Sequence, residues 1–73
     1  METYLRLSFN SEGAKPSEVA DRLRSCGFAP THGNYDFVYD WQGSATREQI
    51  LDLSDEITRQ LRGYRVLFEL ETI

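Results

Sequence analysis

Residues 31–41, THGNYDFVYDW, decide the fold that we expect for this chain. Aromatic residues occupy every second position of the stretch: they are Tyr35, Phe37, Tyr39 and Trp41. Alternate side chains of a β-strand point to opposite faces of a sheet. Residues 35–41 are therefore predicted to form a strand with an aromatic face and a second face that carries Asp36, Val38 and Asp40. Gly33 and Asn34, just before it, tolerate positive φ and predict a tight turn.

Three further segments have strand character. Residues 3–9 alternate between apolar and polar and predict a half-buried strand whose inward side chains are Leu5, Leu7 and Phe9. Residues 64–73 alternate in the same way, with Val66, Phe68 and Leu70 inward. Residues 28–32 predict a short strand at a sheet edge, because Pro30 has no N–H to donate to a neighbouring strand.

Two segments between these strands have helical spacing. Pro16 suits the first position of a helix that runs to Cys26, and Gly27 suits its end. Residues 46–49, TREQ, have the form of a capping box and begin a second helix that ends near Gly63. Its apolar stripe consists of Ile50, Leu53, Ile57 and Leu61.

The order β-α-β-β-α-β predicts an α+β domain with the ferredoxin-like βαββαβ arrangement. In that arrangement two helices cover one face of a four-stranded antiparallel sheet, and the first and third strands are central. Residues 1–73 form one domain. A core of this size rarely supplies more than roughly 3–5 kcal/mol of stability, and small domains commonly gain more by pairing with a second copy. We therefore expect a homodimer.

The free energy of burial predicts which face of the 35–41 strand points toward the helices. Burying two unpaired carboxylates under the helices costs several kcal/mol each, whereas burying a large aromatic side chain gains of the order of 2–3 kcal/mol. We expect Phe37 and Tyr39 to face the helices, with Tyr35 and Trp41 partly exposed at the strand ends. The uncovered face of the sheet is then expected to carry Tyr4, Arg6, Ser8, Asp36, Val38, Asp40, Leu67, Glu69 and Glu71.

Composition excludes several functional classes. The chain has 12 acidic and 8 basic residues, and its net charge of -4 disfavours contact with the phosphates of a nucleic acid. Tyr4 is the only aromatic residue expected on the uncovered face, where a base would stack. We therefore expect no nucleic-acid binding. No apolar run is long enough to span a bilayer, so we expect no membrane contact. The start METYLRLSF does not resemble a signal peptide, and the single cysteine fits a cytoplasmic protein.

No catalytic set is visible in the sequence. His32 is the only histidine and lies beside the predicted turn without the spacing of a metal site. Cys26 ends a helix, where the dipole disfavours a thiolate. We expect no cofactor, no metal and no enzymatic activity. A small enzyme or accessory subunit that uses His32 with nearby acids remains the alternative.

Three roles are open for the uncovered face. It is a solvated lattice of charges, in which Arg6 neighbours Asp36 or Asp40 across the strands, a polar dimer interface, or an acidic surface that docks a basic protein partner. The residues expected at this interface are Tyr4, Arg6, Val38, Asp40, Leu67 and Glu69.

The residues Gly33-Asn34-Tyr35-Asp36, followed by the hydrophobic residues 37–39, resemble a motif of the Lrp/AsnC family. The similarity is to the effector-binding domains of that family, ACT-like modules also called RAM domains, and the order of elements matches over residues 3–73. The resemblance implies dimers that form through their sheets and bind an amino acid near the turn, at a subunit interface. We therefore also expect a non-enzymatic module that self-associates and binds a small metabolite or a protein partner. Gly33, Asn34, Tyr35 and Asp36 would then border the ligand, with backbone N–H groups facing a carboxylate and Asp36 meeting a cationic group.

Overall fold

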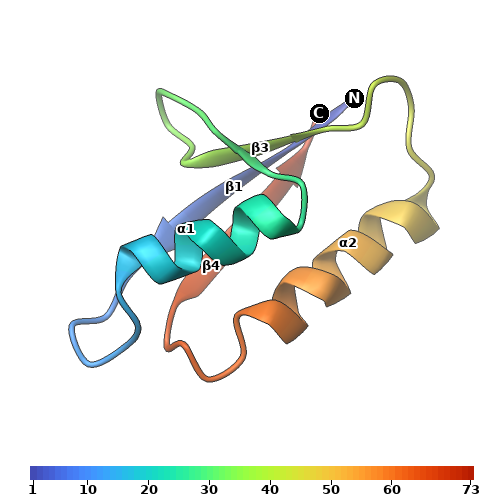
Figure 1. The fold of residues 1–73 in the computed structure, drawn as a ribbon. Helices are drawn as coiled ribbons and strands as arrows, with labels where there is room; N and C mark the ends of the chain where they lie inside the picture. Colours follow the sequence, from blue (N-terminus) through green and yellow to red (C-terminus); the bar gives the residue numbers. More distant parts are fainter.

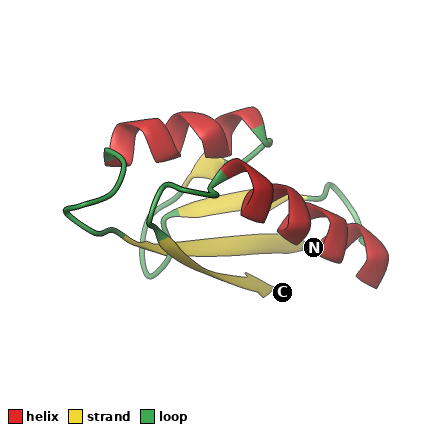
Figure 2. Ribbon diagram, turned by 90° about the horizontal axis from the view of Figure 1, so that it is seen from below, coloured by secondary structure: helices red, strands yellow, loops and turns green.

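Two helices pack on one face of a four-stranded antiparallel sheet in the computed structural model, which describes residues 1–73 (Figures 1 and 2). The elements in chain order are β1 (Glu2–Ser8), α1 (Pro16–Ser25), β2 (Ala29–Pro30), β3 (Phe37–Asp40), α2 (Arg47–Gln60) and β4 (Leu67–Thr72). The strands lie in the order β2-β3-β1-β4, so the predicted central position of the first and third strands is confirmed.

β1 connects the two halves of the sheet. It pairs antiparallel with β3 on one side, where Leu5 lies opposite Phe37, and with β4 on the other, where Leu5 lies opposite Leu70. The two termini lie together at one end of the sheet (Figure 1), because Glu2 and Ile73 exchange both backbone hydrogen bonds. β2 forms one edge of the sheet and β4 forms the other.

The helix ends follow local signals in the sequence. Pro16 begins α1, as predicted. The capping box of α2 is confirmed: the Thr46 hydroxyl accepts from the Gln49 N–H at 3.2 Å, and the Gln49 side chain accepts from the Thr46 N–H at 2.8 Å. Gly27, after α1, has φ +99°, and a Cβ there would lie 2.9 Å from the Tyr39 ring. Glycine is therefore needed at this position for backbone conformation and for space.

The core lies between the sheet and the helices. Its fully buried hydrophobic members are Leu5, Val19, Leu23, Phe28, Phe37, Ile57 and Leu61. Phe37 is 7% exposed and Tyr39 packs against this cluster, so the predicted inward side of the strand is confirmed for both residues. Trp41 is half-buried, and its indole N–H donates to the hydroxyl of the buried Thr3 at 2.9 Å.

Several predicted boundaries and positions are wrong. The first strand spans residues 2–8 rather than 3–9, and Phe9, expected to be inward, is 46% exposed beyond the strand end. The last strand begins at Leu67 rather than at residue 64, because Arg65 has φ +56° and cannot continue an extended chain. The third strand begins at Phe37 rather than at residue 35.

Candidate functional site

Tyr35 lies on the opposite side of the sheet from the one predicted by the alternation. The Asp36 N–H donates to the Leu5 carbonyl at 2.9 Å, and the Asp36 carboxylate accepts from the Leu7 N–H at 2.8 Å. The second bond directs the Asp36 carboxylate to the β1 backbone, and Asp36 remains exposed. The regular alternation of side chains therefore stops at Phe37, and Tyr35 is placed on the uncovered face.

Tyr35 forms a cluster there with three side chains from β1 and β4. Its ring lies 5.0 Å from the Tyr4 ring, centroid to centroid, and the Arg6 guanidinium lies 5.1 Å from the centroid of the Tyr35 ring. The Tyr35 hydroxyl donates to the Glu71 carboxylate. Arg6 also donates from Nε to the Asn34 carbonyl at 3.0 Å. A tilted ring–ring contact, a cation–π contact and hydrogen bonds thus hold two aromatic rings in place on this face.

We call the sheet surface opposite the helices the open face. Its side chains follow from the register of the strands and from the cluster around Tyr35: they are Glu2, Tyr4, Arg6, Ser8, Tyr35, Val38, Asp40, Leu67, Glu69 and Glu71. No helix covers this surface (Figure 2), and the Tyr35 ring, from the loop between β2 and β3, packs onto part of it. The expected interface residues, Tyr4, Arg6, Val38, Asp40, Leu67 and Glu69, all lie on it. The expectation that Tyr4 would be its only aromatic ring is wrong, because Tyr35 is the second.

A series of depressions follows β1 and β4. One of about 290 Å³ lies between Arg6, Tyr35, Glu69 and Glu71. A smaller one of about 90 Å³ lies beside it, where Ser8 faces Leu67. The largest, of about 660 Å³, lies at the end of the sheet where β1 ends and β4 begins. Every depression in the molecule therefore borders β4 or the residues that lead into it.

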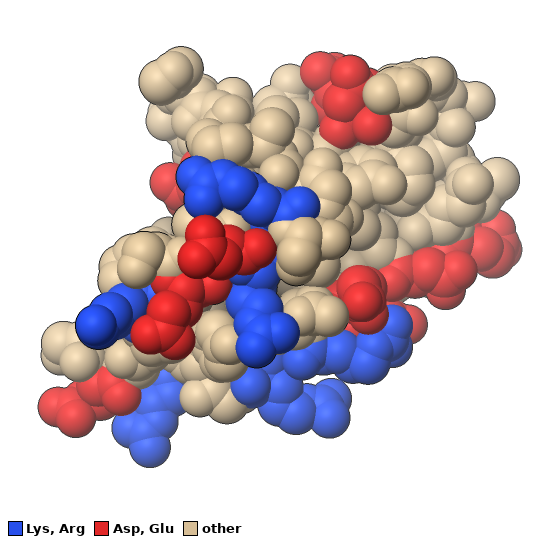
Figure 3. All heavy atoms as spheres, viewed as in Figure 1, with Lys and Arg blue, Asp and Glu red and all other residues tan.

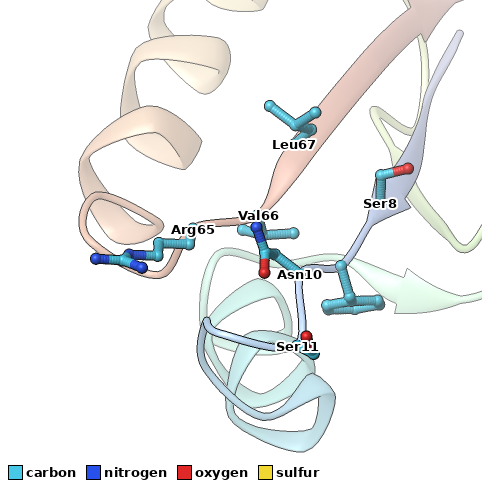
Figure 4. Close-up of a pocket in the computed structure, with 7 residues that line it drawn as sticks. Ser8, Asn10, Ser11, Arg65, Val66 and Leu67 are labelled. Atoms are coloured by element: carbon cyan, nitrogen blue, oxygen red, sulfur yellow. The ribbon is translucent and has the colours of Figure 1, made fainter.

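The largest depression combines apolar and polar groups (Figure 4). It is lined by Ser8, Phe9, Asn10, Ser11, Arg65, Val66 and Leu67. Arg65 extends away from Ser8, toward the loop that follows α2. Leu67 is 76% exposed and is the most exposed large hydrophobic residue of the chain. The sequence placed Leu67 on the uncovered face, but the depression itself depends on the conformation of two loops and had no signal in the sequence.

Charge is distributed unequally between the two faces. The open face carries the carboxylates of Glu2, Asp40, Glu69 and Glu71 and a single cation, Arg6. The other seven of the eight basic residues belong to the helices and loops. On the helix side, basic and acidic side chains are mixed, and the basic ones gather in the lower half, where α2 ends (Figure 3). The open face is therefore the more acidic of the two.

Several polar groups of the predicted ligand site, residues 33–36, already form hydrogen bonds with other residues of the chain. Gly33 has φ +92° but Asn34 has no positive φ, so the predicted tight two-residue turn is wrong: the chain bends at these residues within a loop that spans residues 31–36. The Asn34 carbonyl accepts from Arg6, and the Asp36 carboxylate accepts from Leu7. Tyr35 has its ring against Tyr4 and its hydroxyl on Glu71. The loop thus joins β1 to the cluster on the open face. Arg6 forms no ion pair with Asp36 or Asp40, the cross-strand partners that the sequence suggested.

The remaining candidate residues do not form a catalytic arrangement. His32 is exposed beside the turn. Cys26 is half-buried at the end of α1, where burial, and to a smaller extent the charge of Glu56, raises the pKa of its thiol. Such a thiol is a poor nucleophile near neutral pH. No group of three or more His, Cys, Asp and Glu side chains comes together as a metal site.

Neither helix has the length and apolar character needed to cross a membrane. In comparisons with known proteins, no family model, no curated protein and no solved structure matches this chain.

Proposed function

We propose that the chain is a non-enzymatic, protein-binding module of the ferredoxin-like βαββαβ type, which docks a basic partner on its open face. The element order and the strand order β2-β3-β1-β4 support the fold assignment. The observation that carries the function is the composition of the open face, where four carboxylates and one guanidinium surround a fixed pair of tyrosine rings.

The tyrosine pair gives this face a preformed contact surface. Tyrosine supplies a large contact area with few rotatable bonds, so little conformational entropy is lost when a partner packs on it. The ring of Tyr35 is already held by Tyr4, Arg6 and Glu71 before any partner arrives. Carboxylates around the rings attract lysine and arginine side chains and speed the encounter with a basic surface.

A matched pair of charge variants tests this function. The variant Glu69→Gln/Glu71→Gln removes two charges from the open face and keeps an oxygen acceptor for Tyr35. The variant Glu48→Gln/Asp52→Asn removes two charges from α2. We expect an eight-residue peptide with four lysines to bind the native protein, and to bind the open-face variant about tenfold more weakly. The α2 variant should bind like the native protein.

Fluorescence anisotropy of the labelled peptide measures these affinities. Binding should weaken as the salt concentration rises, because the contact is partly electrostatic. Equal losses in the two variants would indicate attraction to net charge alone and would contradict a specific role of the open face. Peptides with four serines or four glutamates in place of the lysines serve as controls.

Self-association through the same face is the second candidate, supported by the exposure of Leu67 and Phe9, which line the same depression. Sedimentation velocity distinguishes it from partner binding. If two copies associate there, Leu67→Lys weakens the association and Leu51→Lys, at an exposed position of α2, leaves it unchanged. A strict monomer at high micromolar concentration would contradict self-association and leave the docking of a basic partner unaffected.

A further inference from the structure

The outer side of β4 carries backbone groups without partners. Glu2 and Ile73 exchange both of their backbone hydrogen bonds, which fixes the alternation between β1 and β4. In an antiparallel pair, every second residue bonds the neighbouring strand and the residues between them point away. Leu67, Glu69 and Glu71 therefore bond β1. The N–H and C=O groups of Phe68, Leu70 and Thr72 point outward, and β4 has no strand on that side.

The opposite edge of the sheet is different. β2 consists of Ala29 and Pro30 alone, and a proline has no N–H to offer to a further strand. An edge this short, with a proline, is a common protection against pairing with other chains. β4 has six residues and no proline, so it is the edge that can accept an added strand.

Charge on β4 selects the strand that it can accept. If a second copy paired antiparallel with β4 around Leu70, Glu69 of each copy would lie opposite Glu71 of the other. Like charges directly opposite each other destabilise a pair of strands. A strand with lysine or arginine at these positions would instead meet Glu69 and Glu71 with opposite charge. The residues between them would lie on the helix side, beside the apolar side chains of Phe68 and Leu70.

We infer that the β4 edge binds an extended segment of a protein partner in which basic residues alternate with apolar ones, and that this segment becomes a fifth strand of the sheet. The inference takes one premise from the proposed function, namely that the partner is positively charged. The depression beside Leu67, lined in part by Phe9 and Val66, continues this edge and accepts an apolar side chain of the segment. Backbone bonds to β4 hold the strand, and the two glutamates select its sequence.

Three eight-residue peptides test the inference on the unmodified protein. The parent peptide alternates lysine and valine. The second carries N-methyl groups on the two central valines, and the third carries them on the two central lysines. In an antiparallel fifth strand, the valine N–H groups point to β4 and the lysine N–H groups point away. We expect the valine-methylated peptide to bind about tenfold more weakly than the parent, and the lysine-methylated peptide to bind like the parent.

Amide hydrogen exchange, measured residue by residue by NMR, gives a second readout within the same strand. Addition of the parent peptide should slow the exchange of the Phe68, Leu70 and Thr72 amides. The amides of Leu67, Glu69 and Glu71 are already bonded to β1 and serve as the internal control, with little change.

The results separate this inference from the proposed function. Equal affinities of the two methylated peptides, whether both bind like the parent or both fail, overturn the fifth strand. If the parent still binds and still requires Glu69 and Glu71, docking on the open face stands without it. No binding by the parent, and no slowing of the three outward amides, contradicts both.

Discussion

Two leucines in the helices occupy opposite environments. Leu23 in α1 is fully buried, whereas Leu51 in α2 is 55% exposed. We expect Leu23→Ala to lower the free energy of unfolding by about 2–5 kcal/mol, because it leaves a cavity in the core. Leu51→Ala should change it by about 0.5 kcal/mol or less. Urea unfolding followed by circular dichroism measures the change for Leu51→Ala, and the circular dichroism of Leu23→Ala in water reports how much of that variant stays folded.

The small core makes a milder variant necessary. Since a core of this size rarely supplies more than roughly 3–5 kcal/mol, Leu23→Ala is expected to be largely unfolded in water. Ile57→Val at a second fully buried position should cost about 0.5–1.5 kcal/mol and still show a measurable transition. An equal loss for Leu51→Ala and Ile57→Val would contradict the position of the core.

At the scale of the element, the start of α2 depends on its capping box. Thr46→Ala removes the hydroxyl that accepts from the Gln49 N–H and should lower the free energy of unfolding by about 1 kcal/mol. Thr46→Ser keeps the hydroxyl and should retain most of the stability. Thermal unfolding measures the effect, since about 1 kcal/mol corresponds to a fall of about 4–8 °C in Tm for a domain of this length. Equal Tm values for the two variants would contradict the cap.

Glu56, near the end of α2, is expected to make the stability of the fold depend on pH. Hydrogen bonds from Arg59, and secondly from Gln60, lower the pKa of Glu56 from 4.5. A lowered pKa means that ionised Glu56 contributes to stability above pH 4.5 and that this contribution is lost as the pH falls through the folded pKa. Glu56→Gln should therefore be less stable than the native protein at neutral pH, and the difference should shrink in acid.

Urea midpoints at neutral and at acidic pH measure this difference. Asp55→Asn removes a neighbouring charge of α2 that forms no ion pair and is the matched control. The effect is small because Glu56 is exposed to solvent screening. A constant difference at both pH values would show that Glu56 acts through packing rather than charge.

At the scale of the whole molecule, the position of β1 predicts where the fold is most resistant to opening. β1 is bonded by β3 on one side and by β4 on the other, and its Leu5 is fully buried. We expect the β1 amides to exchange slowest and to report global unfolding, and the amide of Ala29 in the short edge strand to exchange much faster. Residue-resolved hydrogen exchange tests this order. Fast exchange throughout β1 would contradict it.

The sequence predicted the elements whose signals are local. The capping box at Thr46, the proline at the start of α1 and the strand alternation of Phe37 and Tyr39 depend on neighbouring residues, and all three are confirmed. The boundaries of the strands were less accurate. Arg65 adopts a positive φ that its residue type does not indicate, and Phe9 lies past the last residue that pairs with β4.

The candidate site was only partly visible in the sequence. The expected interface residues, including Val38 and Leu67, could be assigned to one face because alternation is a property of each strand alone. The cluster of Tyr35 with Arg6 and Glu71 could not be predicted from the sequence, because it joins three segments that are distant in the chain. The free edge of β4 could not be predicted either, since it depends on which strand lies at the edge of the sheet.

By itself, then, the sequence determined the types of the elements and the inward direction of the central aromatic side chains, because burying a ring is favourable and burying an unpaired carboxylate is not. The tertiary structure alone decided the side on which Tyr35 lies. The Asp36 carboxylate accepts a hydrogen bond from the N–H of Leu7, which lies in β1, 29 positions earlier in the chain. With that bond the Leu7 N–H of β1 has a side-chain acceptor in place of a backbone carbonyl of β3, the regular alternation ends at Phe37, and Tyr35 lies on the open face against Tyr4 and Arg6.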